Sequence, residues 1–158
     1  MSNNPISLKQ MRRMLWLMGV IKIPMIAFVR PKLLQLDDNV AQVRIKLRRR
    51  TKNHLKSMYF GALAVGADVA AGLHAYYFAQ KAGVKVSFAF KGVKAEFLKR
   101  ATSNIIFHSN DGSIVQDAFK EAMETKERVN KWVRAEAKTK AQEKIAIFDM
   151  EISVKVKL

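Results

Sequence analysis

A single carboxylate interrupts an apolar stretch of this chain. Residues 61–72 read GALAVGADVAAG, and Asp68 is the one acid within the longer apolar run from Met58 to Ala79. His74 is the only other group in that run that titrates near neutral pH. An unpaired carboxylate moved out of water costs several kcal/mol or takes up a proton instead. Asp68 is therefore either a structural hydrogen-bond anchor or a group that does chemistry.

Few other groups in the chain could support catalysis. The absence of cysteine excludes thiolate chemistry, a disulfide framework and a cysteine-based metal site. The three histidines, His54, His74 and His108, do not have the spacing of metal ligands, so we expect no metal site. His74 lies six residues after Asp68, off its helical face, and is interpreted as a packed core histidine.

The net charge of +16 is the strongest global signal. A chain of 158 residues with 49 % apolar and 27 % charged residues is typical of one folded globular domain. So large a positive charge favours a polyanionic partner, which could be nucleic acid, a phosphate-bearing ligand or a membrane surface. The sequence contains no RNA-recognition signature and no helix-turn-helix glycine pattern, so nucleic acid rests on charge alone. The basic segment RIKLRRRTK (44–52) is either a solvated strand face and loop or a phosphate site.

Hydrophobic periodicity predicts the elements of the first half. Apolar residues at 3–4 spacing predict a helix over residues 8–19, and Pro24 and Pro31 are expected to divide the following chain into short extended pieces. Residues 40–50 alternate and predict a half-buried strand with a basic outer face. Residues 57–81, ended by Gly83, are apolar almost all round, which indicates one long enclosed helix.

The second half alternates like a set of strands around one small helix. We expect a hairpin-like link at Lys91-Gly92 and a helix behind an Asn110/Asp111 cap. The order of elements indicates an α+β architecture, in which a sheet wraps around a single helix. The predicted strands are 84–90, 93–98, 104–108, 128–140 and 144–158, and the small helix is 111–128.

The N-terminal stretch LKQMRRMLWLMGVIKIP is basic and rich in methionine. It lacks a small-residue cleavage site and keeps its charges throughout, which favours an amphipathic surface helix over a signal peptide. We expect a cytoplasmic protein, with peripheral contact to an anionic membrane as an open possibility. The apolar run 58–79 approaches the length of a membrane span, but Asp68 and the many small residues argue against one.

Residues 53–72, NHLKSMYFGALAVGADVAAG, resemble the signature of hotdog-fold acyl-CoA thioesterases of the phenylacetate-pathway type. That signature is Asn, five residues, His-Gly-Gly, then Asp at the seventh position after the last glycine. Asn53, Gly61 and Asp68 match it in register, whereas Tyr59 replaces the histidine and Phe60 the first glycine. The stretch VKAEFLKRA resembles a second strand of this family. The stretch EAMETKERVNKWVRAEA resembles the corresponding part of a branch of the family known as a domain of unknown function.

The resemblance implies a hotdog fold, in which a curved antiparallel sheet wraps around one long central helix. The hotdog domain would cover residues 30–158, and residues 1–29 would form an N-terminal amphipathic helix and linker. A homodimer or homotetramer is implied, with the site shared between subunits.

The resemblance also assigns roles at the site. Asp68 would be the nucleophile or the general base, and Asn53 would polarise the thioester carbonyl. The backbone N–H of Phe60 would stabilise the oxyanion, because the N-terminus of a helix favours negative charge. Tyr59 would replace the contact made by the family histidine or plug the site. Ser87, on the next strand, would assist the acid.

Coenzyme A would enter as part of the substrate, and no separate cofactor is expected. Its phosphates would be steered by cations, for which Lys91, Lys94, Lys99 and Arg100 compete with the 44–52 segment.

Three functions therefore remain open. The chain could hydrolyse acyl-CoA, it could be a non-catalytic hotdog protein that binds acyl-CoA or a fatty acyl chain, or it could bind nucleic acid or an anionic membrane.

Overall fold

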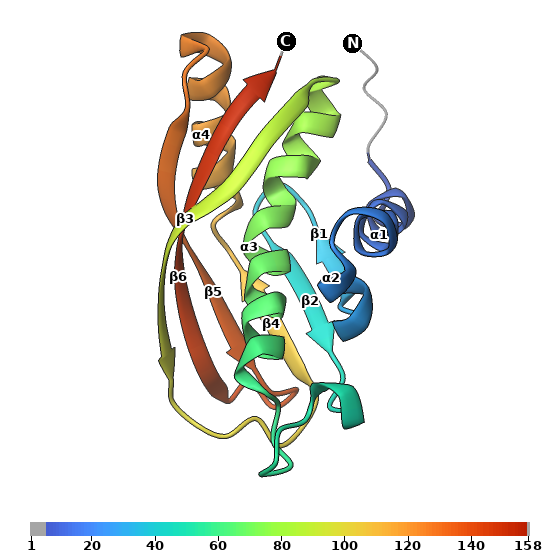
Figure 1. Cartoon of the computed structure of the whole chain (residues 1–158). Coiled ribbons are helices and arrows are strands. Elements are labelled where there is room, and N and C mark those ends of the chain that lie inside the picture. The colour runs from blue at the N-terminus through green and yellow to red at the C-terminus, as the bar shows by residue number, and fades with distance from the viewer. Residues whose placement is uncertain (1–5, 158) are drawn as a thin grey trace.

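The computed structural model describes residues 6–157, which form a curved antiparallel sheet wrapped around one long helix (Figure 1). Within those residues the sheet has six strands in the order β1-β2-β4-β5-β6-β3, and all neighbours run antiparallel. The predicted α+β hotdog architecture is confirmed. The first five residues of the expected N-terminal segment and the last residue of the final expected strand lie outside the described residues.

The strands are β1 (Lys32–Leu36), β2 (Ala41–Ile45), β3 (Lys85–Phe97), β4 (Ile105–Ser109), β5 (Val129–Lys138) and β6 (Lys144–Lys157). The helices are α1 (Leu8–Leu17), the π-helical turn η1 (Met18–Lys22), α2 (Pro24–Val29), the 3₁₀ turn η2 (Arg49–Thr51), α3 (Phe60–Ala82) and α4 (Gly112–Thr125).

The central helix α3 is continuous over 23 residues and ends where Gly83 takes a left-handed conformation at φ 68°. The expected single helix over 57–81 is thus confirmed, apart from a later start. Its small residues let it lie close to the sheet: a Cβ on Gly66 would collide with the ring of Phe107 on β4. Among residues 6–157, no helix combines the length and the apolar character that crossing a membrane needs.

One stripe of α3 is only half-buried, and it lies toward the edge strand β3 of the sheet. Helices α1 and α2 lie on one side of α3, next to β1, and β3 lies on the other side of α3 (Figure 1). The stripe therefore forms the floor between two walls. Its members are Gly61, Ala64, Val65, Asp68 and Tyr76.

Two expectations about local structure are wrong. The predicted link at Lys91-Gly92 does not turn the chain, because β3 pairs with β6 along its whole length and has a bulge between Phe90 and Gly92. A bulge inserts one residue and shifts the alternation, which gives a sequence pattern like that of a tight turn. The segment after Pro24 was expected to be extended but forms α2, with Pro24 in its first turn, where a proline is well tolerated.

The strand expected over 40–50 ends at Ile45, and the separate strand β1 precedes it. Asp111 occupies the N-cap position of α4, yet its carboxylate accepts a hydrogen bond from the backbone N–H of Arg134 (2.7 Å) on β5 instead of capping the helix. The last strand alternates as expected, and its inner face is buried. That face consists of Ala146, Phe148, Met150, Ile152, Val154 and Val156.

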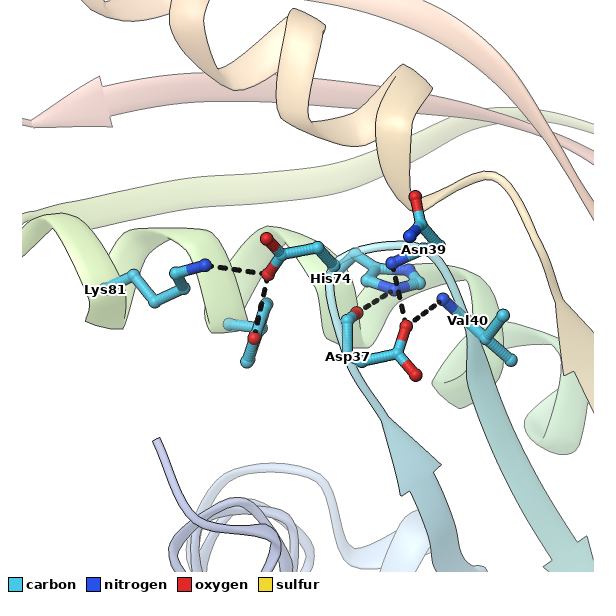
Figure 2. A network of polar contacts seen from close by, with 7 residues as sticks. Asp37, Asn39, Val40, His74 and Lys81 are labelled. Atoms are coloured by element: carbon cyan, nitrogen blue, oxygen red, sulfur yellow. Dashed lines mark hydrogen bonds and ion pairs between the residues drawn. The ribbon is translucent and has the colours of Figure 1, made fainter. Parts of the chain in front are cut away.

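A polar network fixes the β1–β2 loop against α3 (Figure 2). The Asp37 carboxylate accepts hydrogen bonds from the backbone N–H groups of Asn39 (2.9 Å) and Val40 (2.8 Å). Its backbone carbonyl lies 3.0 Å from Nε2 of His74, and a carbonyl only accepts, so Nε2 carries the proton. Burial lowers the pKa of His74 and keeps its ring neutral. His74 is therefore a core histidine, as predicted.

The same loop also holds the last turns of α3. The carboxylate of Asp38 accepts hydrogen bonds from the Tyr77 hydroxyl (2.9 Å) and from Nζ of Lys81 (2.7 Å), drawn on the left of Figure 2. The bond from Lys81 lowers the pKa of Asp38. These contacts fix the position of α3 along the sheet.

Candidate active site

Asp68 lies midway along α3, on the half-buried stripe, at the floor of an apolar groove. It lines a cavity of about 550 Å³ between α3 and the strands β3 and β6. It also lines a smaller cavity of about 180 Å³, walled by the N-terminal helices on one side and by β3 on the other. The larger cavity is formed by Ala64, Val65, Asp68, Phe90, Lys91, Gly92, Val93, Phe148 and Met150.

The Asp68 carboxylate has no hydrogen bond or ion pair with any residue of the described chain. Burial among apolar side chains raises the pKa of Asp68 from an ordinary value of 3.8 to about 6. The phenol of Tyr76 also has a raised pKa, mainly through burial and in addition through the charge of Asp68. At neutral pH Asp68 is thus largely ionised, yet it is a stronger base than an exposed carboxylate.

The start of α3 presents free backbone donors. Tyr59 takes the N-cap position without a side-chain cap, and its carbonyl accepts the N–H groups of Ala62 (2.9 Å) and Leu63 (3.1 Å). The N–H groups of Phe60 and Gly61 have no acceptor in the part of the chain that the structure describes. Unpaired N–H groups and the helix dipole together favour an anion at this position.

The rings of Tyr59 and Phe60 frame these donors. Both side chains are exposed, and their ring centroids lie 4.9 Å apart. The Tyr59 ring covers Gly61 so closely that a Cβ there would collide with it. Glycine at position 61 therefore permits the position of the Tyr59 ring.

Asn53 organises the loop that leads into α3. Its Oδ1 accepts hydrogen bonds from the backbone N–H groups of Leu55 (2.9 Å) and Ser57 (3.1 Å) and from the Ser57 hydroxyl (3.1 Å). Its side-chain nitrogen has no acceptor within residues 6–157. The oxygen thus serves a structural role, while the amide N–H groups are available to a ligand.

The acid and the donors are not in contact within one chain. Gly61 and Asp68 are seven residues apart on the same helix, which places them about 10 Å apart along its axis. One reacting atom cannot lie within about 3 Å of both groups.

Ser87 is not brought to Asp68. Its neighbour Phe88 packs against Tyr76 and Gly72 of α3, and successive side chains of a strand point to opposite faces. The Ser87 hydroxyl accepts a hydrogen bond from Nη2 of Arg128 (3.2 Å) on the outer face. The expectation that Ser87 assists the acid is wrong for this chain.

The four cations expected to bind coenzyme A are scattered. Lys91 lines the larger cavity with Asp68. Lys94 lies on the outer face, with Nζ 5.1 Å from the ring centroid of Trp132. Lys99 forms an ion pair with Glu143 (3.3 Å). Arg100 precedes Ala101, whose carbonyl accepts the N–H of Met58, so that it lies near the start of α3.

Sequence reasoning missed the wall of the groove that the N-terminal helices supply. The available signal was the 3–4 spacing of apolar residues in the first predicted helix, to which Leu15 and Met18 belong. The residues of this N-terminal segment that line the cavity with Asp68 are Leu15, Met18, Ile23 and Ile26. Within residues 6–157, no three side chains among His, Asp and Glu lie close enough together to hold a metal ion.

A family described as a domain of unknown function (DUF4442) matches residues 11–156. The chain belongs to the DUF4442 family. No curated protein sequence matches the chain. The fold of this DUF4442 chain is that of several solved structures. A thioesterase candidate from Shewanella oneidensis is 14 % identical with a TM-score of 0.81, and the match covers 94 % of this chain and 99 % of the other.

Two further solved structures share the fold of the DUF4442 chain. A protein from Pseudomonas aeruginosa, described as a probable thioesterase of unknown function, is 17 % identical with a TM-score of 0.74 over 97 % of this chain and 98 % of the other. A thioesterase from Haemophilus influenzae is 7 % identical with a TM-score of 0.67 over 96 % and 92 %. At such identities the likeness establishes the hotdog fold.

Proposed function

We propose that this DUF4442 protein hydrolyses acyl-CoA thioesters with Asp68 as the nucleophile or general base. The observation that carries the proposal is an unpaired carboxylate of raised pKa on the floor of an apolar groove, at the position of the acid in the thioesterase signature. The thioesterase descriptions of structures with the same fold agree with this reaction class.

The groove suits the chemistry of a thioester. Its apolar walls would accept the acyl chain, and the ionised Asp68 would face the carbonyl carbon. The carboxylate would either attack that carbon, giving a mixed anhydride and the thiolate of coenzyme A, or take a proton from a water that attacks it. In the first case water then cleaves the anhydride and regenerates the carboxylate. A pKa of about 6 combines ionisation at neutral pH with appreciable basicity.

We further propose that two copies complete the site. The edge strand β3 has one side unpaired in a single chain, and an exposed edge is a liability unless it is covered. Its inward-facing residues Val93 and Phe97 are 59 % and 51 % exposed. Two-fold pairing at this edge would cover them and bring the free N–H groups of Phe60 and Gly61 of one copy toward Asp68 of the other.

Release of free thiol from a panel of acyl-CoA thioesters tests the reaction. Asp68→Asn should lower kcat/KM by about 100-fold or more, the usual effect of losing an acid–base or nucleophilic group. Asp117→Asn, the same change at an exposed position of α4, should leave kcat/KM unaltered. If wild type and Asp68→Asn cleave every thioester equally slowly, the hydrolase proposal is wrong.

A second candidate function is binding without turnover, which the large rings of Tyr59 and Phe60 at the helix start favour. Saturable binding of an acyl-CoA that is never hydrolysed, or a fatty acyl ligand identified by mass spectrometry of the purified protein, would support it. The Tyr59→His, Phe60→Gly variant would then be expected to gain hydrolysis, because it restores the signature.

A further inference from the structure

A dense group of cations lies on the outer face of the sheet at its β1–β2 edge. In the strand register Lys32 of β1 lies directly opposite Arg44 of β2. Like charges at directly opposed positions of an antiparallel pair are destabilising. Together with four more cations they surround a cavity of about 220 Å³, here named the basic pocket. Its charged residues are Arg30, Lys32, Arg44, Lys46, Arg48 and Arg50.

No acid of the described chain pairs with the basic pocket. Within residues 6–157, none of its six cations takes part in an ion pair. Among the residues that the structure describes, the buried Nε of Arg44 has no hydrogen-bond partner, and Nη1 of Arg50 donates to the backbone carbonyl of Phe28 (3.2 Å). Residues 1–52 hold twelve Lys and Arg and two Asp, a net +10 of the total +16. Guanidinium and ammonium groups gathered without acids attract an anion, and a phosphate is well matched to the N–H donors of a guanidinium.

An apolar cavity adjoins the basic pocket. It has a volume of about 470 Å³ and shares Arg30 and Lys32 with the basic pocket. Trp16 and Val20 line it and remain 64 % and 52 % exposed. The exposed ring of Phe28 lies 5.3 Å from the guanidinium of Arg50. Cations and exposed apolar side chains are therefore contiguous on this face.

We propose that this face docks on an anionic phospholipid bilayer. The basic pocket binds a lipid phosphate, and Trp16, Val20 and Phe28 enter the boundary between headgroups and acyl chains. Tryptophan, with an apolar body and a polar N–H, suits that boundary. An apolar cavity beside the cations fits an amphiphile, in which a phosphate and acyl chains adjoin. The inference is independent of the reaction at Asp68.

The basic pocket is also separate from the groove that holds Asp68. Arg44 alternates along β2 with Val43 and Ile45, which are fully buried against α3, so its side chain points to the other face of the sheet. The β2 cations of the basic pocket therefore point away from Asp68.

Vesicle co-sedimentation of the full chain tests the docking. The protein should bind phosphatidylcholine vesicles containing about 30 % phosphatidylglycerol, should bind pure phosphatidylcholine much more weakly, and should dissociate as salt is raised toward about 0.5 M. Arg44→Gln with Lys46→Gln should weaken partitioning about 25-fold, at about fivefold per charge.

The matched control is Lys155→Gln with Lys157→Gln, which removes the same charge from exposed positions of β6. This control variant should weaken vesicle binding by less than fivefold, which is the effect of one charge near the membrane surface. Thermal melts of both variants establish that they fold. Asp68→Asn should bind vesicles like wild type, which separates this inference from the proposed hydrolysis. Equal losses in the two double variants would overturn the basic pocket as the docking site.

Trp16 itself reports the orientation. The chain has two tryptophans, so Trp132→Phe leaves Trp16 as the only one. Its emission should shift to shorter wavelength on anionic vesicles and be quenched by brominated acyl chains. An unchanged emission from sedimented protein would overturn the proposed orientation. Two outcomes would overturn the lipid surface as the partner. One is tighter binding to short duplex DNA than to the vesicles, and the other is capture of free coenzyme A in the absence of vesicle binding. In each case the binding would have to be lost with Arg44→Gln and Lys46→Gln.

Discussion

The burial of Asp68 predicts that removing its charge stabilises the protein. In the unfolded chain this carboxyl ionises near pH 3.8, whereas in the folded chain burial raises its pKa to about 6. Because the folded pKa is the higher one, protonation of Asp68 stabilises the folded state relative to the unfolded state. This contribution is complete at pH values below 3.8 and is lost as pH rises through about 6. The native state therefore carries the full cost of the buried charge at neutral and alkaline pH.

The size of this cost follows from the shift. A difference of about two pKa units corresponds to about 3 kcal/mol at pH 8, about half of that near pH 5, and well under 1 kcal/mol at pH 4. Solvent reaches the half-buried carboxylate and lowers the cost, so Asp68→Asn should raise the free energy of unfolding by about 1.5–3 kcal/mol at pH 8.

Urea unfolding of wild type and Asp68→Asn at pH 4, 5, 6 and 8 measures this difference directly. The variants should differ most at pH 8 and converge toward pH 4. Asp117→Asn, at an exposed position, should show no such divergence. A difference between wild type and Asp68→Asn that is constant across this range, or a less stable Asp68→Asn at pH 8, would refute the assignment of a raised pKa to Asp68.

Three further predictions follow from the same geometry. The kcat/KM for acyl-CoA should rise with pH along a titration centred near pH 6 and level off above it, and a midpoint near pH 4 in the pH–rate profile would mean that the groove does not perturb Asp68. Gly66→Ala should lower the free energy of unfolding by about 1–3 kcal/mol in urea titrations, because its Cβ meets the ring of Phe107. Ser87→Ala should leave kcat/KM within about twofold of wild type, since the hydroxyl bonds Arg128 on the outer face, and a tenfold loss would return it to the site.

The sequence alone determined the elements whose patterns are long and regular. The run from Met58 to Ala79 is apolar all round and without proline, which predicts an enclosed helix, and the alternation in the last strand fixed its buried face. The isolation of Asp68 among small apolar residues was equally visible. These features follow from local periodicity, because burial of one face or of a whole segment is written into the order of its residues.

Tertiary structure decided which residues meet. The bulge in β3 looks like a turn in the sequence, since both shift the alternation of side chains, and only pairing with β6 distinguishes them. The face on which Ser87 lies, the groove wall supplied by α1, and the opposition of Lys32 to Arg44 likewise depend on register and packing between segments distant in sequence. Such contacts are set by long-range pairing, and the order of residues along one segment does not encode the neighbour that the fold will place against it.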